Sequence, residues 1–348
     1  MDAPGLGGLL AARVIEEQKG LYRLALENGD RWASVSGRLR SASDSADEMP
    51  AVGDWVLTDP GTPLDQSVIR AVLRRKSAIV RGRFDSKRQG DGYAGQVLAA
   101  NVDTVFVVES LGVAPNFHRI DRFLALAHEG GAWPVILLNK ADLAENSETV
   151  VLETEARHPG VDVIPVSSVS GQGLERLSPY LGPGKTVVQL GPSGVGKSTL
   201  INRLLGRPVQ EVGEVRDSDG KGRHTTTSRQ LLALPDGQGL IIDTPGLRAV
   251  GLTSGEEGLA SAFADVEALA EQCRFRDCTH GSEPGCALRE ALVDGTLNAD
   301  RLESYLGLQH ETRRRRELKD PVSRKKEGRR MARMISEVKR QDKRRFER

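Results

Sequence analysis

The stretch "TVVQLGPSGVGKSTLINRLLG", residues 186 to 206, runs from an apolar strand through a glycine-rich loop into a helical segment. Residues 191 to 198 match every position of the phosphate loop Gly-x-x-x-x-Gly-Lys-Ser. Glycines there permit positive φ angles and let backbone N–H groups converge on phosphate oxygens at a helix N-terminus. Lys197 is expected to neutralise the β- and γ-phosphates, and the Ser198 hydroxyl to bind Mg²⁺. The stretch predicts a nucleotide site.

Two further segments downstream fit the same nucleotide. Asp243 to Gly246, "DTPG", follows the apolar run "GLII". An Asp at a strand end can hold Mg²⁺ through water, and the Gly246 N–H can meet the γ-phosphate. In "GRHTTT", Thr226 is preferred over its threonine neighbours for completing the Mg²⁺ shell, as in a switch loop. The alternatives are an ordinary turn at Asp-x-x-Gly and a surface loop whose threonines cap a strand.

The base motif lies upstream of the phosphate loop. In "VILLNKADL", residues 135 to 143, a strand runs into Asn139-Lys140-Ala141-Asp142, the Asn-Lys-x-Asp signature of guanine recognition. A carboxylate accepts from the ring N–H and the exocyclic amine of guanine, whereas adenine lacks that amine. "SSVSG", residues 167 to 171, is expected to offer N–H groups to the guanine oxygen. GTP is therefore favoured strongly over ATP.

The order of these motifs is unusual. Base motif, second base loop, phosphate loop, switch threonines and Asp-x-x-Gly follow one another along the chain. This order predicts a circularly permuted GTPase domain, because the ends of parallel strands still converge at one edge of the sheet. Leu247 follows Gly246, where Ras-like GTPases have a glutamine that orients water. His224 is the nearest candidate general base, and a solvent-facing loop histidine is the alternative.

The rest of the chain suggests a multidomain protein. From about residue 100 to 250, apolar strands alternate with helical stretches, which indicates a mostly parallel sheet covered by helices. Residues 1 to 95 carry short alternating segments typical of a small antiparallel barrel. The basic strip from Arg70 to Arg83 slightly favours nucleic-acid contact over a solvated strand face. Two helical stretches are expected between residues 252 and 310.

The three cysteines of the chain fall within fourteen positions, in Cys273-x4-Cys278-x-His280-x5-Cys286. Three thiolates and one imidazole are the ligand set of a closed, tetrahedral zinc site. Such a site leaves no open position for catalysis, so it is expected to stabilise a small domain with little core. Three free buried cysteines are the alternative.

Charge is distributed unevenly. The net charge is +1, yet residues 311 to 348 hold 17 Lys or Arg against 7 Asp or Glu. A basic tail on an acidic body favours a polyanionic partner, with a solvated charged helix as the alternative. The N-terminal residues show no basic segment leading into a long apolar run, and no stretch reaches membrane-spanning length. The cytoplasm is the expected compartment.

Together these motifs resemble the ribosome small subunit-dependent GTPase A family, the circularly permuted GTPases of bacterial ribosome maturation. The resemblance implies an oligonucleotide-binding (OB) barrel, a permuted G domain and a zinc domain. It also implies GTP-dependent work on the 30S subunit and 16S rRNA late in assembly, with release of an assembly factor and of the GTPase itself on hydrolysis. Missing the usual glutamine is consistent with the family, whereas the long Arg-rich tail is less standard.

The expected organisation is an OB-fold RNA-binding barrel (1–95), a permuted α/β G domain (96–251), a mainly helical zinc domain (252–310) and a basic tail (311–348). We expect a monomeric GTP phosphohydrolase, stimulated by the subunit, with one structural zinc ion and with Mg²⁺ bound by Ser198, Thr226 and Asp243. Rival hypotheses are a GTP-binding scaffold without hydrolysis and a pure RNA-binding module. The expected catalytic residues are His224, Thr226 and Lys197. The expected GTP contacts are Asn139, Lys140, Ala141, Asp142, Ser167, Ser168, Gly191, Pro192, Ser193, Gly194, Val195, Gly196, Lys197, Ser198, Thr199, Asp243 and Gly246.

Overall fold

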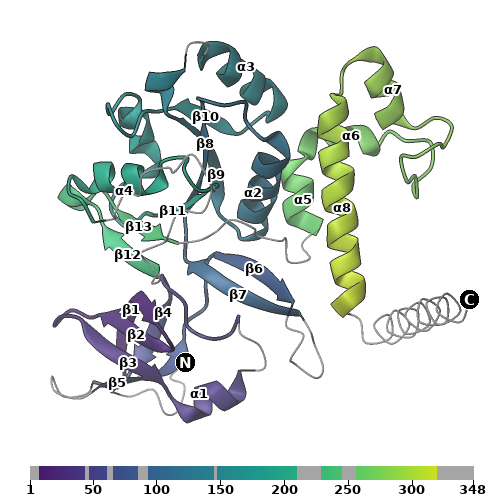
Figure 1. The fold of residues 1–348 in the computed structure, drawn as a ribbon. Coiled ribbons are helices and arrows are strands. Elements are labelled where there is room, and N and C mark those ends of the chain that lie inside the picture. The colour runs from purple at the N-terminus through teal and green to yellow at the C-terminus, as the bar shows by residue number, and fades with distance from the viewer. Residues whose placement is uncertain are drawn as a thin grey trace, which may run out of the picture.

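The computed structural model describes residues 8–43, 47–60, 66–84, 93–144, 147–209, 229–244 and 256–319. Figure 1 shows three parts: a barrel near the N-terminus, a central sheet flanked by helices, and a group of helices beside the sheet. Among these residues, no helix is both long and apolar enough to cross a membrane.

The N-terminal part is a closed five-stranded barrel. Its strands are β1 (Leu10–Gln18), β2 (Leu21–Ala25), β3 (Arg31–Val35), β4 (Trp55–Thr58) and β5 (Ser67–Val72). Their order is β1-β2-β3-β5-β4, and β4 pairs back onto β1. Only β3 and β5 run parallel. Alternate residues point inward, which is why the core contains Ala12, Val14, Tyr22, Leu24, Ala33, Val35, Val56 and Ile69. Closure removes the exposed strand edges, and the predicted OB-type barrel is confirmed.

The alternating segments of the first 95 residues are not all strands. "RWASVSGRL" forms β3 only as far as Val35, and residues Gly37–Ala42 form the helix α1. The Ser36 side chain accepts a hydrogen bond from the Leu39 N–H at 3.2 Å, which caps the helix. The local capping bond therefore ends the strand.

A hairpin connects the barrel to the central sheet. β6 (Ala78–Phe84) and β7 (Tyr93–Ala100) form a separate two-stranded sheet. Ala78 N–H donates to the Gly130 carbonyl at 2.9 Å, and Ile79 and Leu98 enter the largest core. The hairpin therefore packs on the central part rather than extending the barrel.

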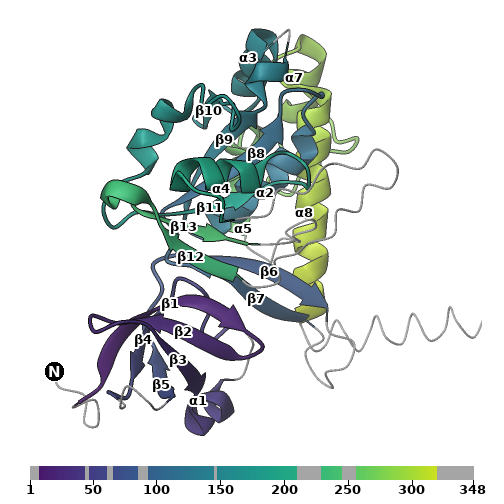
Figure 2. The ribbon, with the colours of Figure 1, turned by 60° about the vertical axis from the view of Figure 1, so that its left-hand side comes forward.

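The central sheet contains five parallel strands and one antiparallel strand. The parallel strands lie in the order β10 (Asp162–Pro165), β9 (Trp133–Asn139), β8 (Thr104–Ser110), β11 (Thr186–Leu190) and β13 (Leu240–Asp243). β12 (Arg229–Ala233) follows antiparallel at the edge and pairs with β1 of the barrel. Figure 2 shows β12 beside the barrel. This pairing joins barrel and sheet into one eleven-stranded sheet.

Helices cover both faces of the sheet. α2 (Phe117–Glu129) lies on one face, begins at the capping side chain of Asn116 and ends at Gly130. α4 (Lys197–Leu205) and the 3-10 helix η2 (Leu174–Tyr180) lie on the other face, where a second core forms. α3 (Ser147–Arg157) packs beside β10. Every residue of β8 is buried, as expected for a strand covered on both sides.

In residues 256–319, the described C-terminal part, the two expected helical stretches are divided into four helices. They are α5 (Glu256–Ala262), α6 (Ala264–Ala270), α7 (Ala287–Asp294) and α8 (Ala299–Lys319). The stretch before the cysteines is divided into α5 and α6 at Phe263, whose backbone is not helical. α5 and α8 pack on α2, and apolar residues such as Leu259 and Leu302 share a core with the sheet.

A buried polar cluster joins these helices to α2. Arg301 of α8 donates to Asp121 of α2 at 2.5 Å and to Asp265 of α6 at 2.8 Å. His158 lies on the other side of Asp121, with Nε2 at 3.0 Å from Oδ1. Its Nδ1 faces the Thr154 carbonyl at 2.9 Å. Asp121, His158 and Arg301 are all buried, so the charges compensate one another inside the protein.

Candidate nucleotide and metal sites

One side chain ties the base motif to the phosphate loop. Asn139, at the end of β9, donates from Nδ2 to the Val195 carbonyl at 2.7 Å. Its Oδ1 accepts from the Ser168 N–H at 3.0 Å and from the Ser168 hydroxyl at 2.8 Å. Asn139 is only 1% exposed, so these bonds form in a site of low polarity, where they are strong. Three segments distant in sequence therefore meet at one edge of the sheet.

The loop glycines allow this close approach. A Cβ on Gly196 would lie 2.3 Å from Asn139 Nδ2, and the φ angle of Gly196 is +97°. A Cβ on Gly191 would lie 2.3 Å from the Val108 carbonyl oxygen of β8. The phosphate-loop pattern thus reflects contacts with β8 and β9 as well as access for phosphate.

The charged groups of the loop lie together. Lys197 Nζ donates to the Gly191 carbonyl at 2.8 Å and to the Pro192 carbonyl at 2.5 Å, so its ammonium lies over the loop. Burial raises the pKa of Asp243 to about 6, although the charge of Lys197 acts in the opposite direction. A buried carboxylate beside a phosphate loop suits a divalent cation, because the cation compensates its charge.

The residues after Asn139 turn away from the strand. Lys140 has a φ of 66°, and Ala141 N–H donates to the Val166 carbonyl at 3.1 Å. The 3-10 helix η1 (Ala141–Leu143) follows and leaves the Asp142 side chain exposed. Ser167 is buried, and its hydroxyl accepts from the Ser170 N–H at 3.0 Å, which shapes the second base loop. The carboxylate of Asp142 is thus free to meet a base.

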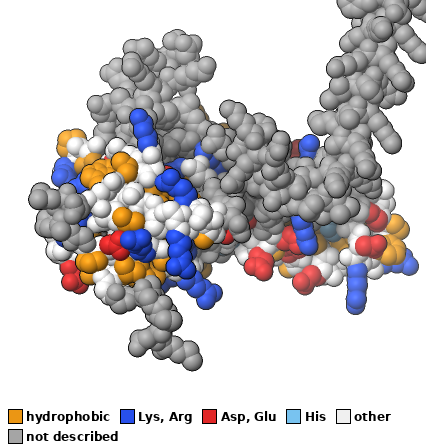
Figure 3. All heavy atoms as spheres, turned by 90° about the horizontal axis from the view of Figure 1, so that it is seen from below, with side chains coloured by type: hydrophobic (Ala, Val, Ile, Leu, Met, Phe, Trp, Pro, Cys, Tyr) orange, Lys and Arg blue, Asp and Glu red, His pale blue; other side chains and the backbone are white. Residues whose placement is uncertain are grey.

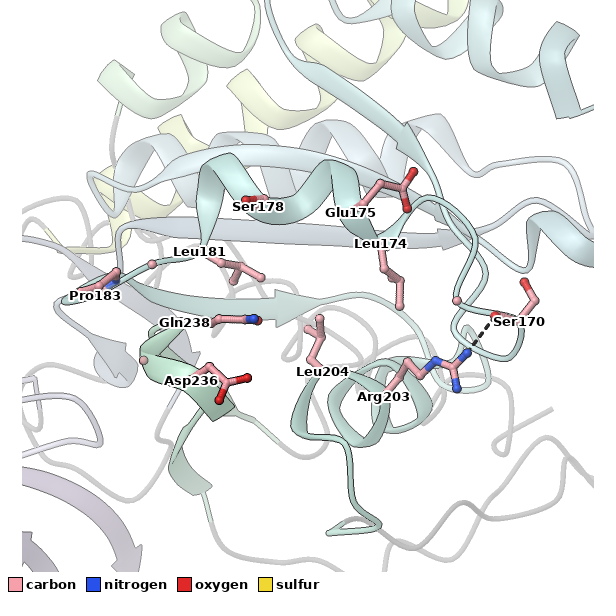
Figure 4. Close-up of a pocket in the computed structure, with 13 residues that line it drawn as sticks. Ser170, Leu174, Glu175, Ser178, Leu181, Pro183, Arg203, Leu204, Asp236 and Gln238 are labelled. Carbon is pink, nitrogen blue, oxygen red and sulfur yellow. Dashed lines mark hydrogen bonds between the residues drawn. The ribbon is translucent and has the colours of Figure 1, made fainter.

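Arg203 of α4 binds the second base loop directly. Its Nη2 donates to the Ser170 carbonyl at 2.7 Å, as the dashed line in Figure 4 shows. Beside this contact lies a hollow of about 660 Å³ between η2, the end of α4 and the turn at Asp236. The contact links the helix after the phosphate loop to the loop expected at the base.

The structure brings together most of the predicted nucleotide residues. The phosphate loop itself, its following helix and both base segments adjoin one another, with Pro192, Ser193, Gly194, Ser198 and Thr199 in the loop and the first turn of α4. His224, Thr226 and Gly246 lie outside the described residues. Their roles stay predictions.

The predicted metal ligands form a compact cluster. The ligand atoms of Cys273, Cys278, His280 and Cys286 all lie within 4.8 Å of one another. Cys273 Sγ is 4.0 Å from Cys286 Sγ, and His280 Nδ1 is 3.7 and 3.6 Å from these two sulfurs. A tetrahedral zinc ion with its usual bond lengths requires S···S and S···N separations of about 3.8 and 3.6 Å. The cluster therefore fits a bound metal ion.

Glu283 fixes the loop that carries His280. Its carboxylate accepts from the hydroxyl and the N–H of Thr279 and, at 2.9 Å, from the Gly281 N–H. These bonds, the Thr279 hydroxyl first, lower the pKa of Glu283 to about 2. His280 between them has a φ of 61°, so the carboxylate supports a backbone turn that non-glycine residues rarely adopt.

Comparisons with known proteins agree with this geometry. A family model described as RsgA GTPase matches residues 72–253. The chain belongs to the RsgA GTPase family. It is similar to small ribosomal subunit biogenesis GTPase RsgA 2 of Lactiplantibacillus plantarum, at 44% identity, with 87% of this chain and 84% of that protein covered. For RsgA of Streptomyces avermitilis the identity is 46%, with 88% and 80% covered.

Solved structures support the same RsgA architecture. The crystal structure of YjeQ from Thermotoga maritima is similar to this chain, with 27% sequence identity and a TM-score of 0.62. The match covers 87% of this chain and 98% of the YjeQ chain. YloQ, described as a circularly permuted GTPase, is 24% identical with a TM-score of 0.60, over 90% and 99%, and shows the fold alone. The permuted order predicted from the sequence is confirmed, and this RsgA family member is a GTPase.

The basic strip predicted at residues 70 to 83 is partly used inside the RsgA fold. Arg75 donates to both carboxylate oxygens of Asp54, at 2.8 and 2.7 Å, and to backbone carbonyls. Arg70 pairs with Asp59 on the surface. Arg74 and Lys76 remain exposed. Sequence alone does not distinguish these uses.

A surface of aromatic and basic residues lies on the barrel instead. Trp32 and Trp55 are 41% and 43% exposed. Trp32 is paired across the strands with Arg23, and the Arg13 guanidinium lies 5.2 Å from the Trp55 ring. Figure 3 shows Lys and Arg side chains interspersed with hydrophobic ones over the barrel. Each of the two exposed tryptophans on the barrel therefore lies beside an arginine, of which Arg23 is also paired with Asp30.

One residue beside the nucleotide site is not predicted from the sequence. Gln189, two positions before the phosphate loop, is 3% exposed within a strand otherwise rich in apolar residues. A polar amide in a buried strand is the signal that marks it.

Proposed function

We propose that this chain binds the small (30S) ribosomal subunit through 16S rRNA and hydrolyses GTP to GDP and phosphate during late 30S maturation, stimulated by the subunit. The relatives named above as small ribosomal subunit biogenesis GTPases support this role. The observation that carries the nucleotide chemistry is the Asn139 side chain, which bridges Val195 and Ser168. The cytoplasm is the corresponding compartment, and we expect a monomer.

In the proposed reaction, residues of the phosphate loop bind the triphosphate and stabilise the charge that develops on it. Backbone N–H groups of residues 191 to 198 and the Lys197 ammonium would face the β- and γ-phosphates. Ser198, Thr226 and Asp243 would hold Mg²⁺, which neutralises phosphate charge when bound. Water attacks the γ-phosphorus as the bond from this phosphorus to the β–γ bridging oxygen breaks, giving GDP and phosphate. Leu247 cannot orient that water, so we assign this role to His224, with Thr226 ordering the loop beside it.

Guanine selection rests on the open carboxylate of Asp142, exposed on η1. Asn139 holds the loop geometry, Lys140 and Ala141 line the ring, and Ser167 and Ser168 shape the loop that faces the guanine oxygen. All three thiolates and His280 would hold one structural zinc ion, because the separations fit and no ligand position stays open.

The barrel face is the proposed rRNA interface. Exposed aromatic rings such as Trp32 and Trp55 provide stacking surfaces for unpaired bases, and nearby arginines provide charge for the backbone. The Arg-rich segment beyond residue 311 supplies further positive charge. The pure RNA-binding hypothesis explains these surfaces but gives no role to an intact phosphate loop.

Nucleotide state is proposed to control release. Binding of the γ-phosphate would order residues 213 to 228 and the turn at 243 to 247, and would change how the zinc domain sits on the G domain. Hydrolysis would relax this arrangement and lower the affinity for rRNA. We therefore expect 30S subunits to bind more tightly with a non-hydrolysable GTP analogue than with GDP. Equal affinities would exclude this control.

The deciding experiment measures phosphate release from GTP and ATP with no particle, 30S, 50S or 70S added. We expect slow intrinsic GTP turnover, a large increase with 30S and little ATP turnover. Lys197→Ala should abolish the stimulated reaction. GTP binding without any stimulated release would favour the scaffold, and unchanged turnover in Lys197→Ala would contradict the enzyme.

A further inference from the structure

Gln189 is a buried amide on β11, close to the phosphate loop. Neither its Oε1 nor its Nε2 has a partner among the described residues, and the side chain is 3% exposed. Its neighbours on β11 are apolar and buried. An unpaired buried amide lowers stability, so an apolar residue would suit the strand better on packing grounds alone.

The register of the sheet places Gln189 beside Asp243. β11 and β13 run parallel, with Val187 opposite Ile241 and Val188 opposite Ile242. One residue further, Gln189 and Asp243 are lateral neighbours on strands about 4.8 Å apart. Alternation puts both on the face that carries α4, because Val187 and Ile241 belong to the core on that face.

A side-chain hydrogen bond joins the same pair of strand ends. The Thr244 hydroxyl donates to the Gln189 carbonyl at 3.4 Å, and Thr244 is buried. Asp243 therefore cannot move far from Gln189 without breaking this contact.

We propose that Gln189 is a positioning residue for Asp243: when nucleotide and Mg²⁺ bind, its amide N–H, unpaired in this structure, donates to the carboxylate and orients it toward the magnesium ion. The inference rests on the proposed Mg²⁺–GTP site. A primary amide is suited to this task, because it donates without adding a charge that competes with the cation. Gln189 on β11 thus lowers the stability of the nucleotide-free protein and favours metal binding.

The test compares Gln189→Met with the unaltered protein. Methionine has a similar length and no hydrogen-bonding amide. Binding of a fluorescent, non-hydrolysable GTP analogue is measured while Mg²⁺ is titrated, without a chelator, so that the Cys and His cluster is left intact. We expect the Mg²⁺ midpoint to rise about tenfold, as for loss of one hydrogen bond to a charged group. The melting temperature of the nucleotide-free protein should rise by about 2–4 °C.

Val188→Ala is the matched control, since Val188 is buried on the same strand but faces the opposite core. It should lower the melting temperature and leave the Mg²⁺ midpoint unchanged. Equal midpoints for Gln189→Met and the unaltered protein would overturn the role of Gln189 alone, as would an equal rise in Val188→Ala. If Mg²⁺ fails to strengthen analogue binding in the unaltered protein, the proposed nucleotide site is wrong.

Discussion

At the scale of single residues, two glycines show what the absence of a Cβ atom contributes around the phosphate loop. Gly196 and Gly206 stand at the two ends of α4, both with positive φ, at +97° and +64°. A Cβ on Gly196 would meet Asn139 Nδ2, whereas a Cβ on Gly206 would meet nothing within 4 Å. Two residues of the same kind thus carry different constraints.

We expect Gly196→Ala to weaken GTP-analogue binding by about 100-fold or more, because it displaces Asn139 as well as straining the backbone. Isothermal titration measures the affinity. Gly206→Ala should cost about 1 kcal/mol of stability from backbone strain alone and leave affinity unchanged. Similar losses of affinity in both variants would contradict the role of the Asn139 contact.

Asp142→Asn should change which base is preferred. An amide at this position can donate to the oxygen that xanthine has where guanine has its amine, while it loses the carboxylate that guanine needs. Competition between GTP and XTP for the fluorescent analogue measures the preference. Unchanged GTP affinity together with weak XTP binding would show that Asp142 does not face the base.

At the scale of elements, α8 is attached to α2 by buried charge. Arg301 also donates to the Ala262 carbonyl at 2.8 Å, and its guanidinium lies 4.1 Å from the Phe263 ring. Burial alone would raise the pKa of Asp121, but the His158 hydrogen bond and the Arg301 charge outweigh it, and the pKa falls below its ordinary value. The contacts of Arg301 therefore hold α8 against α2 and α6.

Arg301→Met should destabilise the protein by about 3–5 kcal/mol, because Asp121 would remain buried without the guanidinium that pairs with it. Urea unfolding followed by circular dichroism measures the change. Arg313 on the same helix is 78% exposed in its side chain, and among the described residues its one ion pair is with Glu317. Arg313→Met should change stability by less than about 0.5 kcal/mol.

Acid should remove the advantage that Asp121 provides. Its folded-state pKa lies below the unfolded one, so the stabilisation is present above about pH 4 and is lost as pH falls through the folded-state value. Asp121→Asn should therefore be less stable than the unaltered protein at pH 6, and the difference in stability should narrow as the pH falls below about 4. A difference that stays constant over this range would contradict the assignment.

At the scale of the whole molecule, the metal cluster belongs to the main core. Cys286 is 2% exposed, stands at the start of α7 and packs with Leu288 and Phe263 in the core that includes α2. Losing the ion would leave this corner with thiols and an imidazole but no common partner.

Chelation should release about one zinc ion per chain and accelerate hydrogen exchange first in residues 264–298. Strands β8 and β11, buried between two cores, should retain their protection. Metal analysis and exchange mass spectrometry measure both effects. Uniform exchange after complete zinc loss would show that the cluster does not stabilise this part.

Much of the site was predictable because its chemistry is local. "GPSGVGKST", "NKAD" and "SSVSG" each follow a strand, and parallel strands end at one edge, so their meeting follows from the alternation of strands and helices. The spacing of Cys273, Cys278, His280 and Cys286 likewise predicted a group of side chains that fits a metal ion. The helix α1 was missed because a single capping side chain, Ser36, decided it.

The sequence by itself therefore determined the classes of site, their permuted order and the families of side chains that form them. The tertiary structure alone decided which polar residues contact one another inside the protein. Arg75 binds Asp54, Arg301 binds Asp121 across 180 positions, and Gln189 lies beside Asp243. The physical reason is the distance along the chain over which each kind of information acts. Motifs encode backbone shape and chemistry over a few residues, whereas the partner of a buried charge or amide is set by packing between elements far apart in the chain.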